Sequence, residues 1–398
     1  MFRPNPFRTL IFLLVLTGTA IAHAQPTSVN RHIGQQFPSV WDQEQPLERF
    51  LSAVAQRSWI QLEYLHWDLK NPGGEGLGAP VGDITDFNSS FQVFDNLNGG
   101  VSAGQAIIPS NAFLGIEDTP GVRGTLGVDL NGGAMEMSFF GTQQNGDTLH
   151  FVDLQRGRGA IGTDVSPNII TPLLTNGTVT TSAALNSFVY DSSFRAKLDA
   201  QIWGAEIMLL KDHYLPGPGL SCQWLGGFRY VNYDEDLIHV GVFNNGGTVA
   251  NRVTRIGGNT VNNIYGPEVG ARASFQSKFI TLSATPRIAF ALNDHTSHVV
   301  SGPLTAANEP NSLLVKESID FTPIVQVNLQ VQIHLNSQFT LFGGYDFLYI
   351  YQMSRPDENI VYDSSPGPGG GFTPNILQRV NLTDFSANGF NMGAMFTY

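Results

Sequence analysis

The sequence is short of the residues on which several common protein classes depend. Its single cysteine, Cys222, excludes an intramolecular disulfide and a cysteine-ligated zinc site. Charged residues make up only 14% of the 398 residues, against about 25% in ordinary soluble domains, which disfavours a long cytosolic helical protein. Cations are the scarcer sign, with 21 Lys and Arg against 33 Asp and Glu. Because binding to phosphates needs clustered cations, nucleic acid is not expected as a partner.

Long hydrophobic runs are also missing after the first two dozen residues, so no segment reaches the roughly 20 apolar residues of a membrane helix. At the start of the chain, Arg3 and Arg8 precede an apolar run at Leu10–Leu16, and Ala22 and Ala24 are small residues at cleavage positions. This pattern predicts a signal peptide at residues 1–24 and export of the chain. We expect residues 25–57 to form a periplasmic N-terminal segment.

What the sequence does contain is strict alternation of apolar and polar residues. Within residues 322–336, Gln, Asn and His side chains alternate with the apolar residues Val325, Val327, Leu329, Val331, Ile333 and Leu335. Successive strand side chains point to opposite faces, so one face is wholly apolar over about 35 Å at roughly 3.3 Å per residue. The same period recurs at 122–130, 194–202 and 269–275. Helical periodicity is nearly absent, and the pattern predicts an all-β fold.

These runs predict ten strands, near residues 59–69, 121–131, 133–143, 192–212, 220–235, 264–276, 279–292, 320–335, 339–352 and 386–398. Short and long connections alternate, and the five long ones lie near 70–120, 144–191, 236–263, 293–319 and 353–385. Bacterial outer-membrane barrels have short periplasmic turns, long external loops and an even strand count. We therefore predict an antiparallel outer-membrane β-barrel at residues 58–398. A hairpin around Thr296–Ser301 would raise the count to twelve.

The end of the chain agrees with this prediction. Apolar residues alternate from Phe390 to the terminal Tyr398. A last strand of this kind closes the barrel against the first strand and serves as the signal for the barrel-assembly machinery. We therefore expect that machinery and outer-membrane lipid as partners of the chain.

Several blocks together resemble one known family. They are Gly343–Ile350 followed by Ser354–Asp357, Gly227–Tyr230 with Glu235 and Leu237, Ile264–Gly266 with Gly270–Arg272, Trp203–Glu206, and Ala387–Phe396. In this order they are similar to motifs of the β-barrel porin family seven, found mainly in planctomycete-type bacteria. The resemblance covers the chain from about Trp59 onward, departs from the family pattern at Tyr265 and Pro267, and implies an outer-membrane location and a porin-like label without a substrate.

Strand number sets the width of a barrel interior. Eight-stranded barrels are filled by side chains and open porins have 16–18 strands, so ten strands predict a narrow interior. Ten charged residues are candidates to face it: Arg123, Asp129, Glu136, Arg195, Lys197, Asp199, Arg229, Glu268, Arg272 and Arg287. Six basic and four acidic side chains packed across a narrow lumen would pair with one another. The alternative is a charged constriction that selects ions by sign.

Two clusters raise the possibility of catalysis. Asp294-His295 lies near His298, and Asp234-Glu235-Asp236 lies near His239. A general base needs its carboxylate and imidazole to be in contact, whereas neighbours on an extended strand point to opposite faces. We therefore predict no enzyme activity, and neither a cofactor nor a metal site. The expected function is porin-like passage of small solutes. The alternatives are a non-conducting structural or adhesive barrel acting through its loops, and a soluble secreted β-protein.

Overall fold

The computed structural model describes residues 57–73, 76–81, 91–95, 101–152, 168–179, 187–213, 219–244, 250–304, 310–366 and 372–398. The predicted signal peptide and the segment 25–56 lie outside the described residues. Among the residues that are described, no helix is both long and apolar enough to cross a membrane.

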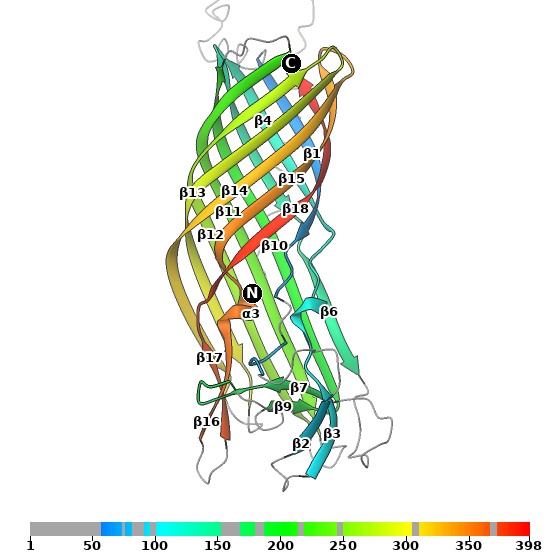
Figure 1. The fold of residues 1–398 in the computed structure, drawn as a ribbon, viewed down its shortest axis with the longest axis vertical. Helices are drawn as coiled ribbons and strands as arrows, with labels where there is room; N and C mark the ends of the chain where they lie inside the picture. The colour runs from blue at the N-terminus through cyan, green and yellow to red at the C-terminus, as the bar shows by residue number, and fades with distance from the viewer. Residues whose placement is uncertain are drawn as a thin grey trace, which may run out of the picture. The chain divides into compact units, whose positions relative to one another are not determined.

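Ten antiparallel strands close into a ring (Figure 1). In ring order they are β1 (Ser58–Leu69), β4 (Thr119–Leu130), β5 (Gly133–Thr142), β10 (Ser193–His213), β11 (Leu220–Phe243), β12 (Arg252–Gln276), β13 (Ile280–Ser301), β14 (Ser312–His334), β15 (Phe339–Ser354) and β18 (Leu382–Thr397). The C-terminal strand β18 pairs with β1, with Tyr64 opposite Met392, and so leaves the ring without an open edge there. The ten-stranded barrel is thus confirmed. Thr296–Ser301 belongs to β13, so no added hairpin raises the count to twelve.

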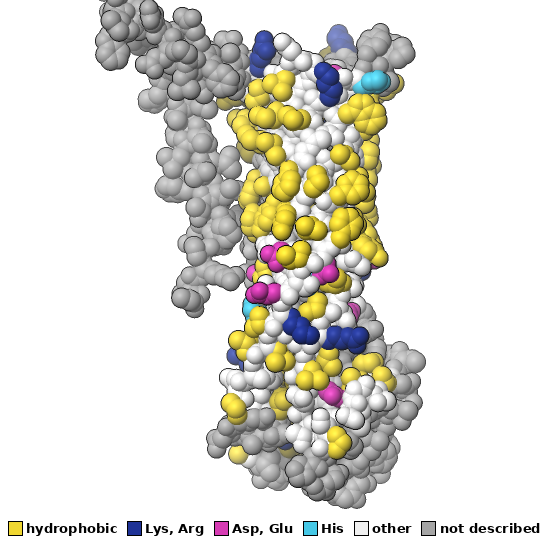
Figure 2. All heavy atoms as spheres, turned by 90° about the vertical axis from the view of Figure 1, so that its left-hand side faces the viewer, with side chains coloured by type: hydrophobic (Ala, Val, Ile, Leu, Met, Phe, Trp, Pro, Cys, Tyr) yellow, Lys and Arg dark blue, Asp and Glu magenta, His cyan; other side chains and the backbone are white. Residues whose placement is uncertain are grey.

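The apolar face of the alternating strands is the outer face of the ring. On β14 the outward side chains of Val325, Leu329, Val331 and Ile333 are 38–48% exposed, whereas the inward Gln326 is 4% exposed. The neighbouring strand β13 has the same orientation, because Leu282 lies directly opposite Val331 in the strand register and is also exposed. Figure 2 shows these hydrophobic side chains as a band over the end of the barrel that carries the short turns.

The strands differ in length, and this difference corrects two of the predicted loops. β10 to β14 have 21 to 25 residues, whereas the other five ring strands have 10 to 16. Most of the predicted loops 236–263 and 293–319 is therefore strand, because the hydrogen-bonded ladders continue to Phe243↔Arg252 and Ser301↔Ser312. The five long strands form a wall that extends beyond the apolar band, and β6 (Asn145–Val152) pairs with the outer part of β10.

The other three long connections contain elements of their own. One small sheet consists of β2 (Phe91–Asp95), β3 (Val101–Ile107), β7 (Asn168–Pro172) and β9 (Ser187–Tyr190). A second consists of β8 (Leu174–Thr175), β16 (Ile360–Pro366) and β17 (Phe372–Gln378), preceded by the single helical turn α3 (Pro356–Asn359). A 3₁₀ turn, η2, covers Asn111–Phe113. Both small sheets lie at the long-loop end of the barrel (Figure 1).

An apolar core fills the interior of the barrel at its long-loop end. Inward side chains of the ring, among them Phe194, Leu198 and Tyr233, pack with side chains from the long connections, such as Ile116 and Ile360. A smaller apolar cluster of Ala134, Met208, Leu210 and Leu225 lies inside the ring near its short-turn end. The interior is therefore occupied by packed side chains at both levels.

The outer apolar face predicts a depth-dependent cost for a charge. We expect Leu329→Arg, in the apolar band, to lower the free energy of unfolding by about 2–4 kcal/mol, because arginine is poorly solvated by lipid. Val315→Arg, farther out on the same face of β14, should cost about 0–1 kcal/mol. Urea unfolding from lipid vesicles measures both. Equal costs at the two positions would show that the apolar band is not the lipid-facing zone.

Candidate functional site

A layer of charged side chains crosses the interior of the ring. Glu206 of β10 accepts hydrogen bonds from Arg229 of β11 at 2.6 Å and from Arg287 of β13 at 2.8 Å. Glu268 of β12 lies 3.0 Å from the Nη2 atom of Arg229. Glu206 and Arg229 stand directly opposite each other in the β10–β11 register, on its inward face. Since β10 and β13 are not neighbours in the ring, the Glu206–Arg287 pair spans the interior.

Two further groups extend the layer. Arg123 of β4 donates to Glu63 of β1 at 3.2 Å and to Asp346 of β15 at 3.0 Å. Asp346 also accepts hydrogen bonds from Asn328 at 2.8 Å and Asn391 at 2.9 Å. These contacts connect Asp346 on β15 to three other strands, β4, β14 and β18.

The third group is a bidentate pair between β12 and β5. Arg272 donates to both carboxylate oxygens of Glu136, at 2.7 and 2.9 Å. Such forked pairs are the stronger kind of ion pair, because two parallel hydrogen bonds fix the geometry. We define the charged layer as Glu63, Arg123, Glu136, Glu206, Arg229, Glu268, Arg272, Arg287 and Asp346. Its charged groups pair with one another across the lumen.

Six of the ten predicted lumen-facing residues belong to this charged layer: Arg123, Glu136, Arg229, Glu268, Arg272 and Arg287. Asp129 shares the inward face of β4 with Arg123, but it is exposed near the short-turn end of the strand.

The structure corrects the expectation for Arg195, Lys197 and Asp199, which lie on the outer face of β10. Their neighbours Phe194, Leu198 and Ile202 have no exposed surface and point into the apolar core. The reason is that this part of β10 lies beyond the apolar band, where the outside faces water and the inside is filled with apolar side chains. The polar face of the strand is therefore its outer face at this level.

This orientation predicts the labelling of introduced cysteines. In a Cys222→Ser background, Arg195→Cys should react rapidly with a membrane-impermeant maleimide on intact cells, because the site is exposed on the outer wall. Ala196→Cys, one residue along, should stay unlabelled in folded protein, because Ala196 is fully buried. Mass spectrometry of the labelled protein gives the ratio. Faster labelling at position 196 than at 195 would mean that β10 has the opposite orientation.

Three carboxylates of the layer were not among the sequence candidates: Glu63, Glu206 and Asp346. A signal for each was present. Glu206 and Asp346 are the charged residues of the blocks Trp203–Glu206 and Gly343–Ile350 that carry the family resemblance. Glu63 is the one charged residue in the otherwise uncharged stretch Trp59–Trp67 of the first strand. A charge that interrupts a membrane strand indicates a side chain that needs a partner inside the barrel.

A buried ion pair holds the last long connection, between β15 and β18, in the mouth of the barrel, which is the opening at its long-loop end. Arg355, which follows β15, is 2% exposed and donates to both carboxylate oxygens of Glu235 on β11, at 2.9 Å from Nε and 2.5 Å from Nη2. Its Nη1 atom donates to the carbonyl of Asn71 at 3.0 Å. Burial alone would lower the pKa of Arg355, but the charge of Glu235 outweighs it and raises the pKa further above its ordinary value. Arg355 therefore remains protonated in this contact.

Amide side chains fix the same segment to the wall. Asn262 of β12 donates to the carbonyl of Ser354 at 2.8 Å and accepts from its amide nitrogen at 3.0 Å. Asn359 donates to the hydroxyls of Ser354 at 2.7 Å and of Ser297 on β13 at 3.0 Å. The segment from Ser354 to Asn359 is thus anchored to three strands of the wall.

The two clusters considered for catalysis do not assemble as catalytic groups. His295 points inward with its Nε2 atom 2.8 Å from Asp320, while Asp294 is exposed on the outer face. His239 is buried against the rings of Phe194 and Tyr362. Asp234 and Asp236 lie on the opposite face of β11 from His239, because residues an odd number of positions apart point to opposite faces.

Comparisons with known proteins show the family. The family model "Putative beta barrel porin-7 (BBP7)" matches residues 59–398. No curated protein matches the chain. Among solved structures, the outer membrane protease OmpT from Escherichia coli aligns at 10% identity over 86% of this chain and 97% of its own, with a TM-score of 0.45. The Pseudomonas putida toluene transporter TodX aligns at 8% identity over 87% and 92%, with a TM-score of 0.29. Similarity at this level to these two structures does not indicate an activity for this chain.

Two of the interior ion pairs join family blocks recognised in the sequence. Glu206 of the Trp203–Glu206 block pairs with Arg229 of the Gly227–Tyr230 block, and Glu235 pairs with Arg355. Residues that carry the resemblance thus take part in closing the interior of this ten-stranded ring. With the family model covering residues 59–398, the chain belongs to the beta barrel porin-7 family.

Proposed function

We propose that this protein is a porin-like outer-membrane barrel through which small solutes pass only when the segments in its mouth are displaced. Family membership supports passage, since the family is described as a porin and not as an enzyme. The filled interior supports closure in the observed state. Two barriers lie in series along the axis, the charged layer and the apolar core.

The observation that carries the proposal is the set of ion pairs that span the ring. Glu206–Arg287, Arg123–Asp346 and Glu136–Arg272 each connect strands that are not neighbours. A ten-stranded ring is narrow, so side chains reach across it. Passage therefore requires these pairs to separate or rearrange. It also requires the apolar core, which lies between the charged layer and the long loops, to move first.

Planar-bilayer conductance tests the proposal. We expect the full-length refolded protein to show rare openings and Arg355→Ala to show frequent ones, because the substitution frees the segment that occupies the mouth. Arg255→Ala is the matched control, since Arg255 is an exposed arginine on the outer face of β12. Silence of both the wild-type protein and Arg355→Ala over a range of voltages would overturn the passage of solutes.

The second candidate is a non-conducting barrel that acts at the cell surface. The wall of β10 to β14 and the two small sheets favour it, because they place folded structure beyond the apolar band. A silent protein whose loop sheets bind a surface polymer would support this candidate, and polymer binding is measured with cells that display the protein and cells that lack it.

We propose two partners for a protein at this location. The exposed apolar face of the ring would contact outer-membrane lipid, and the strand Phe390–Tyr398 would be read by the barrel-assembly machinery. Phe390, Met392 and Phe396 share the outward face of β18. Removal of the last residues should leave the protein unassembled in the periplasm, which fractionation of cells detects.

A further inference from the structure

The outer half of β14 has a neighbouring strand on one side only. Its ladder with β13 continues to Ser301↔Ser312, whereas its ladder with β15 ends at Ile324↔Ile350. Among the described residues, no other strand pairs with 312–323. The strand β17 lies near β14, but it pairs with β16 in a separate sheet. This half of β14 is thus an edge strand at one side of the wall that β10 to β14 form beyond the apolar band.

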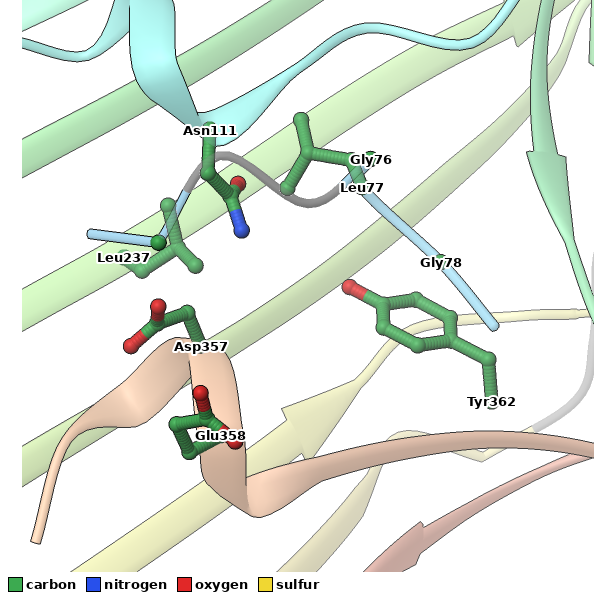
Figure 3. Close-up of a pocket in the computed structure, with 9 residues that line it drawn as sticks. Gly76, Leu77, Gly78, Asn111, Leu237, Asp357, Glu358 and Tyr362 are labelled. Carbon is green, nitrogen blue, oxygen red and sulfur yellow. The ribbon is translucent and has the colours of Figure 1, made fainter. Parts of the chain in front are cut away.

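The edge is open because the chain turns into the mouth after β15. Beyond Ser354 the chain does not continue beside β14, since Arg355 points into the mouth and pairs with Glu235 of β11. Figure 3 shows the connection that follows, where Tyr362 and Leu237 of β11 line one pocket. The contacts that fill the mouth therefore also leave β14 without a second neighbour.

This edge presents backbone groups that have no partner strand. In an antiparallel ladder, hydrogen-bonded and non-hydrogen-bonded pairs alternate. The amide of His334 donates to the carbonyl of Phe279, so the even-numbered residues of β14 bond to β13. The odd-numbered residues bond to β15, as Leu335 does through its amide to Phe339. Beyond the end of that ladder, five residues point their N–H and C=O groups toward the open edge: Leu313, Val315, Glu317, Ile319 and Phe321.

The same residues turn their side chains to the outer face of the wall. Four of them are apolar and 48–62% exposed: Leu313, Val315, Ile319 and Phe321. At the same levels β13 carries polar side chains, since Val315 lies opposite His298 and Ile319 lies opposite Asp294. The inward side is open as well, because no residue in Ser312–Phe321 is buried. An apolar edge strand that is this exposed to water is a template for pairing with another chain.

A second copy in the same membrane cannot pair with this edge through its own β14. Strands of outer-membrane barrels are tilted by about 35–45° from the barrel axis. A twofold axis along the membrane normal would tilt the two β14 strands in opposite directions, so they would cross at roughly 70–90° and could not share a ladder. An extended segment of a different protein has no such restriction, because it can follow the tilt of β14.

Charge adds a preference for one kind of segment. Glu317, at the centre of the edge, is exposed and forms no ion pair with another described residue. Side chains directly opposite each other on paired strands lie on the same face, and opposite charges there stabilise the pair. A segment with a basic residue opposite Glu317 and apolar residues opposite Val315 and Ile319 would therefore complement the edge.

We propose that the outer half of β14 binds such an extended segment, from another protein on the outer side of the membrane, by strand addition. Main-chain hydrogen bonds provide the affinity in this mode of recognition, and alternate side chains provide the specificity. The site does not depend on whether the barrel conducts, because it lies on the outside of the wall.

A designed peptide tests the edge directly. The probe is a short fluorescent peptide in which Thr alternates with Val and one central Lys, added to the full-length protein refolded in lipid vesicles. We expect a saturable rise in fluorescence anisotropy and slower hydrogen exchange of the amides in Leu313–Phe321. The fully N-methylated form of the peptide keeps the side chains but has no backbone N–H donors, and it should bind at least tenfold more weakly.

Two substitutions at one position separate the backbone from the side chain. Glu317→Pro removes one N–H from the open edge and leaves the ladder with β13 intact, because residue 317 does not bond to β13. We expect it to weaken peptide binding at least tenfold. Glu317→Gln is the matched control, since it keeps the N–H and loses only the charge. It should weaken binding by no more than about fivefold, as for other exposed ion pairs.

A further variant keeps the proposal testable if Glu317→Pro does not fold, which heat-dependent migration on a gel identifies. Ile319→Glu retains every backbone group and should also weaken binding at least tenfold, because a charge replaces an apolar contact. Four results would overturn the proposal: no saturable binding to the wild-type protein, equal binding of the N-methylated peptide, equal binding to the wild-type protein and to folded Glu317→Pro or Ile319→Glu, or dimers in vesicles that Glu317→Pro dissociates, since a second copy would then occupy the edge.

Discussion

Arg355→Ala is expected to make the long connection between β15 and β18 sensitive to protease while the ten-stranded ring remains folded. The substitution leaves the carboxylate of Glu235 buried without its partner, and breaking a buried pair in this way costs about 3–5 kcal/mol. The lost contacts lie in the mouth and not in the lipid-facing zone. We therefore expect the substitution to lower the local stability of the apolar core at the long-loop end, and not the stability of the ring. Limited proteolysis of folded protein in vesicles, followed by mass spectrometry, measures the effect.

A matched pair of controls separates the loss of contact from the loss of charge. The double substitution Arg355→Met with Glu235→Leu removes both charges and should recover much of the stability, since no unpaired charge remains. Arg255→Ala removes an exposed arginine and should change little. Equal protease sensitivity of Arg355→Ala and Arg255→Ala would show that the buried pair does not hold the segment.

Glu206→Ala should be the most damaging substitution within the charged layer. It removes the acceptor of both Arg229 and Arg287 and leaves two buried guanidinium groups short of a partner. We expect the free energy of unfolding to fall by about 3–5 kcal/mol, as for other buried pairs that lose one member. Urea unfolding in detergent micelles measures this fall. Conductance of the same variant should shift toward anions, because the layer loses one of its five carboxylates and keeps its four arginines.

The partly exposed pair Lys197–Asp199 on the outer face of β10 provides the comparison for Glu206→Ala. Asp199→Ala should cost about 0–1 kcal/mol, since an ion pair at the surface is screened by water and salt. If Asp199→Ala and Glu206→Ala had the same cost, the charged layer would not be the packed and desolvated interior seen in the structure.

Strand count and closure could be read from the chain because they depend on local alternation. Each run of apolar and polar residues specifies one strand, and the alternating end at Phe390–Tyr398 specifies the strand that pairs with β1. The outer ends of the strands could not be read in this way. Residues 236–243 and 252–263 belong to β11 and β12 because they pair with each other, and such pairing is not visible in either segment alone.

The charged layer was partly predictable for a related reason. Arg229 and Arg272 stand in blocks that identify the family, and their inward orientation follows from the period of their strands. Glu206, the partner of Arg229, was harder to find. Glu206 and Arg287 are 81 residues apart, and they meet only because β10 and β13, three places apart in a narrow ring, both point these side chains into its interior.

Alternation along the chain is enough to establish that these strands form a barrel with an apolar outer face in the region of Val325 to Leu335, because the period of a strand assigns every side chain to one of two faces. It does not establish which face is outside at Phe194 to Ile202. That choice depends on what fills the barrel at each level, and the filling comes from connections distant in sequence that fold into the mouth. The same β10 turns Ile207 and Leu209 outward in the apolar band and Arg195 outward beyond it, since its surroundings change from lipid to water while its geometry does not.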